Sequence, residues 1–259
     1  MNILFVGDIF GSPGRQIVKE FLPGLKEEFN VDICIANGEN VAHGKGITEK
    51  TALELFEAGI DLFTSGNHLW DKRESIEYLK TEKRIIKPLN YPERSVGFNK
   101  LIKTAPDGEK LAIICLVGQV FMTPADSPIN TLERVLPEIQ NETNKILVDI
   151  HAEATGEKRA FGFYFDGKVS AVIGTHTHVQ TADEEILPLG TAYLTDVGMT
   201  GPHDSVIGME IDVILNRMAT CMPQRFDVAK EGLQINAVFI KLDDKSGKAL
   251  EIKRIKRKY

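Results

Sequence analysis

Residues 3–8 read ILFVGD, four apolar residues followed by a glycine and an aspartate. Largely apolar runs of similar length recur along the chain, at Ile3–Val6, Val31–Ala36, Asp61–Thr64, Leu111–Val117, Ile146–Ile150, Val169–Ile173, Ala192–Leu194 and Ile235–Lys241. Because their apolar residues are consecutive rather than alternating, these runs are typical of strands that are buried on both faces.

Helical patterns lie between the strands, at Pro13–Phe29, Thr48–Ala58, Glu74–Lys80, Thr131–Ile139 and Val206–Met218. This alternation predicts an α/β protein with a largely parallel central sheet. From Gln224 onward, two β runs flank a turn at Asp243–Gly247, which indicates a hairpin and therefore mixed sheets in a layered sandwich. No repeat or composition shift interrupts the chain, so we expect a single domain over residues 1–259.

The composition excludes several classes of protein. Of the 259 residues, 42% are hydrophobic and 26% charged, which is ordinary for a globular protein and excludes a disordered or collagen-like chain. The formal net charge of −6 argues against a duplex-DNA-binding protein. The longest apolar stretch, Leu111–Met122, is too short to cross a bilayer, so we expect no membrane partner.

The cysteines and the first residues indicate the cellular compartment, and the last residues form a separate basic segment. Cys34, Cys115 and Cys221 form no CxxC motif, and residues 1–8 lack the basic segment of a signal peptide. These features predict a cytoplasmic protein with reduced thiols. The last nine residues, EIKRIKRKY, are basic. We interpret them as an edge strand protected by Lys and Arg, in preference to a nucleic-acid-binding tail.

Polar residues that can bind metals or take part in catalysis follow the predicted strands, at the point where each strand ends. They are Asp8, then Glu39 and Asn40, then Asn67 and His68, then His151, and finally His176 and His178. The carboxyl ends of parallel strands share one edge of a sheet, where ligands bind. Any one of these residues alone is more often a turn former or a cap, but five such clusters together predict one shared crevice.

These side chains offer oxygen and nitrogen donors without thiolate, which suits divalent manganese, iron or zinc. The set has more ligands than one tetrahedral ion needs, so it fits two ions that share a bridging carboxylate. The candidates are Asp8, Glu39, Asn40, Asn67, His151, His176 and His178. His68 is then left over and is positioned to donate a proton to a leaving oxygen.

At these residues the sequence resembles the calcineurin-like metallophosphoesterases, through GNH at 66–68 and GTHTH at 174–178. Phe10 stands where that superfamily usually has a histidine, and Glu39 stands where it has an aspartate. Both departures are shared with the narrower group of bacterial YmdB-like phosphodiesterases. The chain is similar to this group from end to end, in the segments GDIFGSPGR (7–15), NGENVAHGKGIT (37–48), TSGNHLWDK (64–72), VDIHAEATGEK (148–158), GTHTHVQTAD (174–183) and TDVGMTGPHDS (195–205).

The resemblance implies a four-layer αββα sandwich and a site for two divalent metal ions, iron or manganese, with zinc and magnesium as alternatives. It implies that one ion is held by Asp8, Glu39, Asn40 and His178, and that Glu39 bridges to a second ion held with Asn67, His151 and His176. The implied reaction is attack of a metal-bound hydroxide on a 2′,3′-cyclic nucleotide, opened at the 2′ position, with His68 as proton donor. The implied partner is a small cyclic nucleotide or an RNA end with a 2′,3′-cyclic phosphate.

Other readings stay open. His43 and His203 are candidates for substrate binding; a glycine-rich loop explains His43 equally well, and a helix cap is the alternative for His203. A phosphomonoesterase or 5′-nucleotidase-like enzyme would use the same ligands, and so would a non-catalytic, metal-dependent regulatory protein. A simple nucleotide-binding module leaves the histidines unexplained, and the spacing of Gly7, Gly11 and Gly14 does not match G-x-G-x-x-G. A homo-oligomer is compatible with the sequence.

Overall fold

The first strand of the computed structural model, which describes residues 1–259, is buried on both faces as predicted. In β1 (Asn2–Val6), Leu4 and Val6 face one apolar core, whereas Ile3 and Phe5 face another. This alternation between two cores is why the run has no polar position. The strand therefore lies in the middle of a layered structure.

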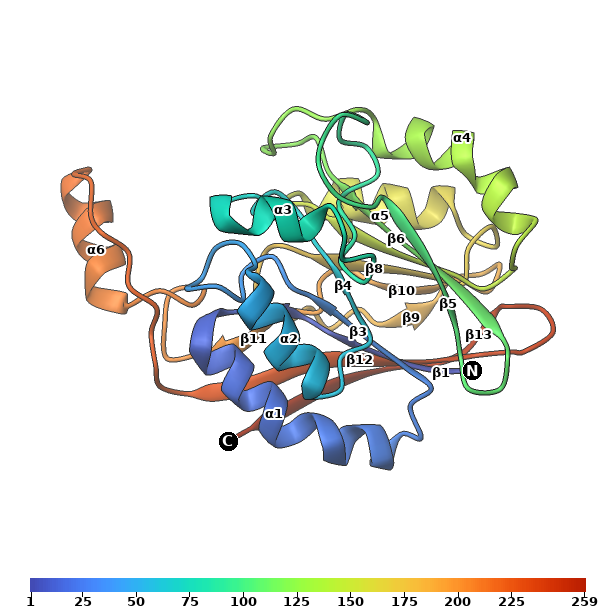
Figure 1. Ribbon diagram of the computed structural model, residues 1–259, viewed down its shortest axis with the longest axis horizontal. Coiled ribbons are helices and arrows are strands. Elements are labelled where there is room, and N and C mark those ends of the chain that lie inside the picture. The colour runs from blue at the N-terminus through green and yellow to red at the C-terminus, as the bar shows by residue number, and fades with distance from the viewer.

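Two mixed sheets form the centre of the molecule (Figure 1). The seven-stranded sheet has the order β2 (Asp8–Ile9), β11 (Met199–Pro202), β12 (Leu233–Leu242), β1, β3 (Ile33–Asn37) and β4 (Leu62–Thr64), with β13 (Ala249–Lys258) on the other edge of β12. The six-stranded sheet has the order β5 (Lys100–Thr104), β6 (Lys110–Val117), β7 (Ile146–His151), β8 (Ala171–Thr175), β10 (Ala192–Leu194) and β9 (Glu185–Ile186).

The strands that carry the predicted site residues run parallel within each sheet. β1, β3 and β4 are parallel neighbours, as are β6, β7, β8 and β10. Antiparallel partners lie outside these groups, with β12 beside β1, β5 beside β6, and β9 beside β10. The predicted C-terminal hairpin is confirmed as β12 and β13, and β13 is an edge strand as interpreted.

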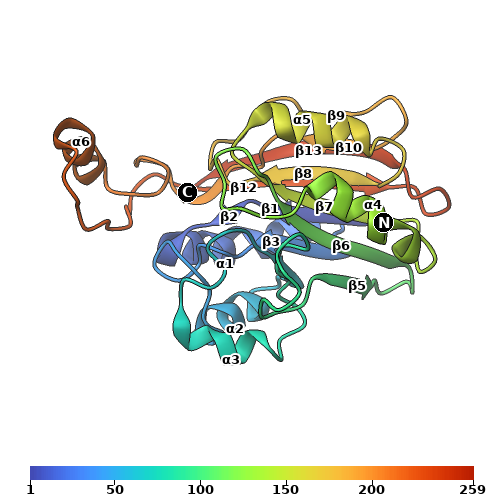
Figure 2. The same cartoon turned by 90° about the horizontal axis from the view of Figure 1, so that it is seen from above.

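The six helices lie outside the two sheets, and all but α6 cover their outer faces (Figure 2). They are α1 (Gly11–Glu28), α2 (Glu49–Glu57), α3 (Ile76–Leu79) with the preceding 3₁₀ turn η1 (Arg73–Ser75), α4 (Pro128–Gln140), α5 (Thr155–Tyr164) and α6 (Ile211–Thr220). Helices α1 and α2 share a core with the seven-stranded sheet. A second core lies between the sheets, and a third lies between the six-stranded sheet and helices α4 and α5.

Several predicted boundaries are wrong. The helix predicted over Val206–Met218 begins only at Ile211, because Gly208 has φ +103° and Val206 and Met209 pair as a β-bridge. That short bridge turns the chain outward, and α6 projects from the body of the molecule (Figure 1). The helix predicted over Glu74–Lys80 is a 3₁₀ turn followed by one α-helical turn.

The three cysteine thiols differ in exposure. Cys34 and Cys115 are buried, whereas Cys221 is exposed after α6. None of the helices is both long enough and apolar enough to cross a membrane.

Candidate metal centre

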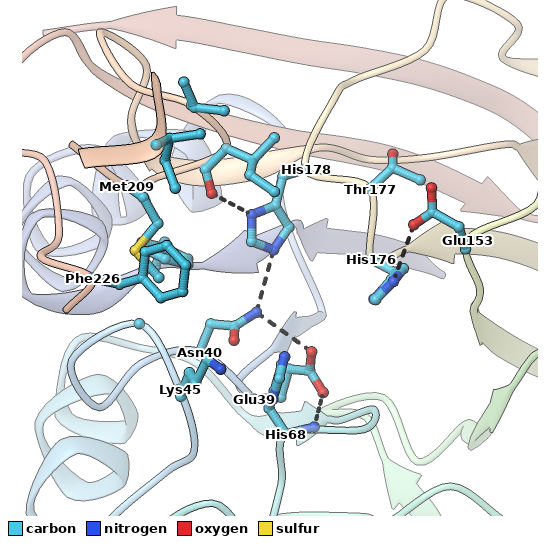
Figure 3. A pocket seen from close by; sticks show the side chains of 15 residues that line it. Glu39, Asn40, Lys45, His68, Glu153, His176, Thr177, His178, Met209 and Phe226 are labelled. Atoms are coloured by element: carbon cyan, nitrogen blue, oxygen red, sulfur yellow. Dashed lines mark hydrogen bonds and ion pairs between the residues drawn. The ribbon is translucent and has the colours of Figure 1, made fainter. Parts of the chain in front are cut away.

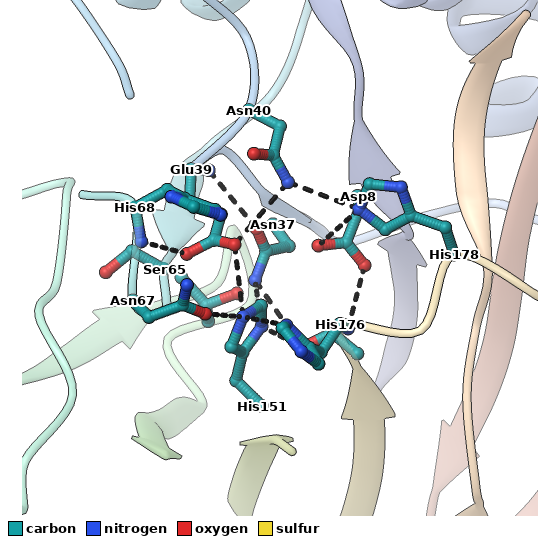
Figure 4. Close-up of polar contacts among 12 residues, drawn as sticks. Asp8, Asn37, Glu39, Asn40, Ser65, Asn67, His68, His151, His176 and His178 are labelled. Atoms are coloured by element: carbon teal, nitrogen blue, oxygen red, sulfur yellow. Dashed lines mark hydrogen bonds and ion pairs between the residues drawn. The ribbon is translucent and has the colours of Figure 1, made fainter. Parts of the chain in front are cut away.

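The polar ends of five strands meet at one end of the two sheets (Figure 4). Asp8 follows β1, Glu39 follows β3, and Asn67 and His68 follow β4 in the seven-stranded sheet. His151 ends β7, and His176 and His178 follow β8 in the six-stranded sheet. Because each sheet directs its parallel strands toward this edge, the two sheets bring all these side chains into one site.

The centre of the site is the Nε2 atom of His151, which is buried. It lies 3.1 Å from Glu39 Oε1, 3.0 Å from Asn67 Oδ1 and 3.1 Å from His176 Nδ1. We call these four residues the His151 cluster. The ligand atoms of Glu39, His151 and His176 all lie within 4.8 Å of one another. They come from three different strands, so only the folded chain assembles them.

Hydrogen bonds around the cluster determine which ring nitrogens are free. The Thr175 hydroxyl donates to Asp149 Oδ1 at 2.7 Å, so its oxygen accepts the Nδ1 proton of His151 at 2.9 Å. The Nε2 proton of His176 faces Glu153 Oε2 at 3.2 Å, which leaves Nδ1 of that ring unprotonated. Both inward-facing nitrogens are therefore available as metal ligands.

The converging atoms suit a cation between them. With Nε2 of His151 unprotonated, two imidazole nitrogens, a carboxylate oxygen and an amide oxygen direct their lone pairs toward one point. Such a set is repulsive unless a positive charge occupies its centre. The donors are the nitrogen and oxygen ligands of zinc, iron and manganese, so the residues present fit a divalent ion.

A second group of candidate ligands lies beside the first. His178 donates its Nδ1 proton to the Ile207 carbonyl at 2.9 Å, which directs Nε2 toward Asp8 Oδ1 at 3.9 Å. The Asn40 amide nitrogen is 3.3 Å from His178 Nε2 and 3.4 Å from Glu39 Oε1. Turning this amide by 180° would place its oxygen there as a ligand. Asp8 Oδ1 is buried without a hydrogen-bond partner, which is a ligand position left open.

Burial and neighbouring charges shift the pKa values of Glu39 and His151 in opposite directions. Burial opposes ionisation of Glu39, but His151 and the His68 amide outweigh it and lower the Glu39 pKa to about 2. Burial also opposes charge on His151, yet Glu39 and the nearby aspartates raise its pKa to about 9. Burial and the adjacent His151 lower the pKa of His176 to about 3. The carboxylates thus favour positive charge at the cluster centre, whether a proton or a metal ion.

The backbone of the histidine segment is strained. His176 and His178 have φ values of +100° and +66°, a region that favours glycine. A buried ion pair holds this segment, because Lys158 Nζ donates to the Thr175 carbonyl and to Asp196 Oδ2, both at 2.7 Å. Strain of this kind persists only where the surrounding structure enforces it, and it directs both imidazoles inward.

His68 lies beside Glu39 at the edge of the site. Its backbone N–H donates to Glu39 Oε2 at 2.8 Å, and its Nδ1 pairs with Asp71 Oδ2 at 2.9 Å. Its Nε2 has no partner within the protein, and the ring lines the cavity in front of the cluster. Asp71 thus orients a histidine whose other nitrogen is free to contact a molecule in the cavity.

A cavity of about 460 Å³ opens onto these residues (Figure 3). One wall is polar and includes Glu39, Asn40, His68, His176 and His178. The other wall is apolar and consists of Phe10, Val206, Ile207, Met209, Ile214 and Phe226. A cavity of this size with polar groups on one side suits a small ligand that has a charged end and a flat apolar part.

Two predicted residues lie outside this cavity. His43 is exposed on the glycine-rich loop, with φ +59°, and does not line the cavity, whereas Lys45 of the same loop does. His203 lines neighbouring hollows, and its Nε2 donates to the Met199 carbonyl at 3.0 Å. Their role in substrate binding stays a prediction.

Sequence reasoning missed several residues that shape the site. Asp149 and Thr175 orient His151 from inside buried strands, and Asp71 orients His68. Asp149 could have been found, because it is the single charged residue in the apolar run 146–150. The apolar wall was not predicted, since Met209 and Phe226 lie outside the quoted motifs.

Gly66 is required by the position of His151. A Cβ at residue 66 would overlap the His151 imidazole ring. We expect Gly66→Ala to displace this ring and to lower metal affinity by about 10- to 100-fold, as loss of a supporting group around a metal does. Metal titration of the stripped protein measures this. Gly156→Ala is the matched control, since its Cβ would meet no atom within 4 Å; equal metal affinity in both variants would contradict the prediction.

Comparison with known proteins agrees with this geometry. The family model described as YmdB-like protein matches residues 4–255. The chain belongs to the YmdB-like family. A YmdB-like relative from Bacillus subtilis (strain 168), a 2′,3′-cyclic-nucleotide 2′-phosphodiesterase, is 47% identical over 98% of this chain and 96% of its own length.

Two solved structures share the YmdB-like fold over the whole chain. A hypothetical protein from Thermus thermophilus has a TM-score of 0.94 at 40% identity, covering 100% of this chain and 99% of the other. A structure described as a novel phosphatase from Mycoplasma pneumoniae has a TM-score of 0.94 at 35% identity, covering 100% of this chain and 93% of the other.

Proposed function

We propose that this protein is a metal-dependent 2′,3′-cyclic-nucleotide 2′-phosphodiesterase. The observation that carries the proposal is the His151 cluster, which faces a cavity that also presents His68 and an apolar wall. The activity of the Bacillus subtilis relative, at 47% identity, supports the same assignment. The polar wall suits the cyclic phosphate, and the apolar wall suits the nucleobase.

We assign two divalent ions, iron or manganese, to this site. Asp8, Glu39, Asn40 and His178 would hold one of them, and Asn67, His151 and His176 would hold the other, with Glu39 shared. When bound, two such ions supply the Lewis acidity that activates a water molecule and neutralises phosphate charge.

The side chains of this protein account for the remaining steps. The oxygen of a water molecule forms a bond to phosphorus, and the bond between phosphorus and O2′ breaks. His68, oriented by Asp71, gives a proton to O2′ as it leaves, and the proton lost by the water restores the imidazolium. The product is a nucleoside 3′-phosphate with a free 2′-hydroxyl. Lys45 at the cavity wall adds a positive charge for the phosphate.

We also assign the fold a four-layer αββα arrangement in a single domain of residues 1–259. Three separate apolar cores support four layers, because each core lies between one pair of neighbouring layers. The hairpin of β12 and β13 supports a single domain, since β12 pairs directly with the first strand.

Parallel assays test the proposed activity. Protein loaded with Mn²⁺ or Fe²⁺ is expected to hydrolyse 2′,3′-cyclic AMP to the 3′-phosphate, and a chelator is expected to stop the reaction. Faster turnover of a phosphomonoester such as 5′-AMP would instead indicate a phosphatase or nucleotidase. If the loaded protein turned over none of these compounds, the metal site would have a regulatory or structural role.

The apolar wall gives a further prediction. We expect Phe226→Ala to raise KM for 2′,3′-cyclic AMP about tenfold with little change in kcat, because stacking on a base contributes to binding rather than to the chemical step. Steady-state kinetics measure both constants. Leu189→Ala, which also shortens an apolar side chain but at an exposed residue outside the cavity, should leave KM unchanged. A parent-like KM in Phe226→Ala would contradict contact between the base and this wall.

A further inference from the structure

A series of hollows connects the catalytic cavity with the end of β13. The first hollow shares His178, Val206 and Ile207 with the cavity. A second hollow shares His178 and His203 with the first, and a third shares Gln234 and Lys256 with the second. We call these three hollows the β13 groove. It begins at a proposed metal ligand and ends at Lys258 and Tyr259.

The groove and the site are joined by the chain itself. The segment that follows His178 lies against β13, where Gln180 Nε2 donates to the Ile255 carbonyl at 3.1 Å. Arg254 donates in turn to the Thr181 carbonyl at 3.2 Å. The groove is therefore a built extension of the histidine segment, and its position relative to the cavity is fixed by hydrogen bonds.

One face of β13 makes this groove basic. Arg254, Lys256 and Lys258 alternate along the strand and all line the groove. Lys256 and Lys258 form no ion pair, and Asp204 is the single acidic residue that lines the three hollows. Arg254 pairs with Glu184 at 3.4 Å.

The basic residues on the opposite face of β13 contact other parts of the protein. Arg257 pairs with Glu28 at 3.1 Å, and Lys253 lies over the ring of Phe29. Protection of an edge strand explains basic residues on this strand, but it does not explain why Lys256 and Lys258 follow one another on the groove face without an acidic partner. In a chain of net charge −6, this face is a local site for anions.

The groove also offers neutral hydrogen-bond donors. Asn236 lines the second hollow, is 1% exposed, and its Nδ2 has no hydrogen-bond partner. Gln234 next to it contacts the His203 ring and Asn236 Oδ1. A buried amide donor without a partner is rare in native proteins, and an oxygen of a ligand would satisfy it.

Resting on the proposed function, we propose that the substrate is the 3′ end of an oligoribonucleotide carrying a 2′,3′-cyclic phosphate. The terminal nucleotide occupies the cavity, and the upstream phosphates bind in the β13 groove at Arg254, Lys256 and Lys258. Hydrolysis consumes one water, breaks the bond from phosphorus to O2′, and leaves an oligonucleotide 3′-phosphate with a 2′-hydroxyl.

The 2′,3′-cyclic phosphate restricts the proposed substrate to RNA. A 2′,3′-cyclic phosphate requires a ribose with both hydroxyl positions, so a strand that ends in this group is RNA. Beyond the terminal nucleotide, such a strand presents one negative charge per residue. A mononucleotide held in the cavity would leave the groove without a function, whereas a strand places successive phosphates along it.

Comparison of two substrates tests the proposal. The probes are 2′,3′-cyclic AMP and a hexaribonucleotide that ends in adenosine 2′,3′-cyclic phosphate, both with the metal-loaded protein. We expect a higher kcat/KM for the oligonucleotide. Lys256→Glu with Lys258→Glu should lower that value at least about tenfold while the mononucleotide value stays within about twofold. Loss of two phosphate contacts should also reduce the salt dependence of log kcat/KM by about 1.4 for the oligonucleotide.

A matched variant controls for net charge. Lys83→Glu with Lys245→Glu makes the same change at two exposed residues outside the groove, and it should keep the oligonucleotide preference. Unchanged mononucleotide turnover shows that the groove variant is folded. Equal kcat/KM for both substrates in the parent protein, or an unchanged preference in the groove variant, would overturn the RNA proposal alone. Absence of turnover on both substrates would contradict the proposed function, and the RNA proposal with it.

Discussion

Glu39→Gln is expected to lose bound metal and to lower kcat/KM by at least about a thousandfold. Glu39 is the carboxylate shared by both ligand groups, because Oε1 faces His151 and Asn40 while Oε2 accepts from the His68 amide. Glutamine keeps the volume but removes the negative charge that balances the ions. Elemental analysis and turnover of 2′,3′-cyclic AMP measure the two effects.

A second carboxylate supplies the control for this variant. Glu153 lies against the outer nitrogen of His176 at 3.2 Å, lines the same cavity and is half exposed. Glu153→Gln should retain both ions and lose activity far less than Glu39→Gln, because it supports a ligand without being one. Parent-like metal content and rate in Glu39→Gln would eliminate the two-ion site.

His68→Ala is expected to lower kcat for 2′,3′-cyclic AMP by about 10²- to 10⁴-fold while metal content stays at the parent value. A positioned proton donor contributes a factor of this size. His68 uses its backbone N–H on Glu39, so replacing the side chain leaves that contact in place. Single-turnover rates together with elemental analysis separate a chemical defect from loss of metal.

The leaving group distinguishes a proton donor from a binding residue. A 4-nitrophenyl phosphodiester has a leaving oxygen that needs no protonation, so the loss in His68→Ala should be much smaller on this substrate. Asp71→Asn should show the same pattern with a smaller loss and a changed pH profile, since Asp71 positions the His68 ring through Nδ1. An equal loss on both substrates would exclude proton donation by His68.

Much of the fold was predictable because its strands are buried on both faces. The run ILFVGD has no polar position before Asp8, and β1 indeed separates two cores. Elements without this signal were missed. Strand β5 (Lys100–Thr104) is half exposed and mixed in composition, and α5 (Thr155–Tyr164) begins without a side-chain cap. The helix predicted from Val206 begins five residues later, because Gly208 adopts a left-handed conformation.

The sequence by itself determined the residues that gather at the site. Parallel strands share a carboxyl edge, so a polar residue after each apolar run was enough to place Asp8, Glu39, Asn67, His151 and His176 together in the prediction. That argument needs only the position of each polar residue at the C-terminal end of its apolar run, together with parallel strands. The basic C-terminal segment was likewise readable as an edge strand.

Only the tertiary structure decided how the site is finished. The proton positions of His151 and His176 follow from Thr175, Asp149 and Glu153, which lie on other segments. The apolar wall joins Phe10 to side chains between residues 206 and 226, and the β13 groove joins one face of β13 to β12 and to residues 178–180. Such surfaces depend on side-chain direction and on contacts between distant segments, and neither leaves a periodic pattern in the sequence.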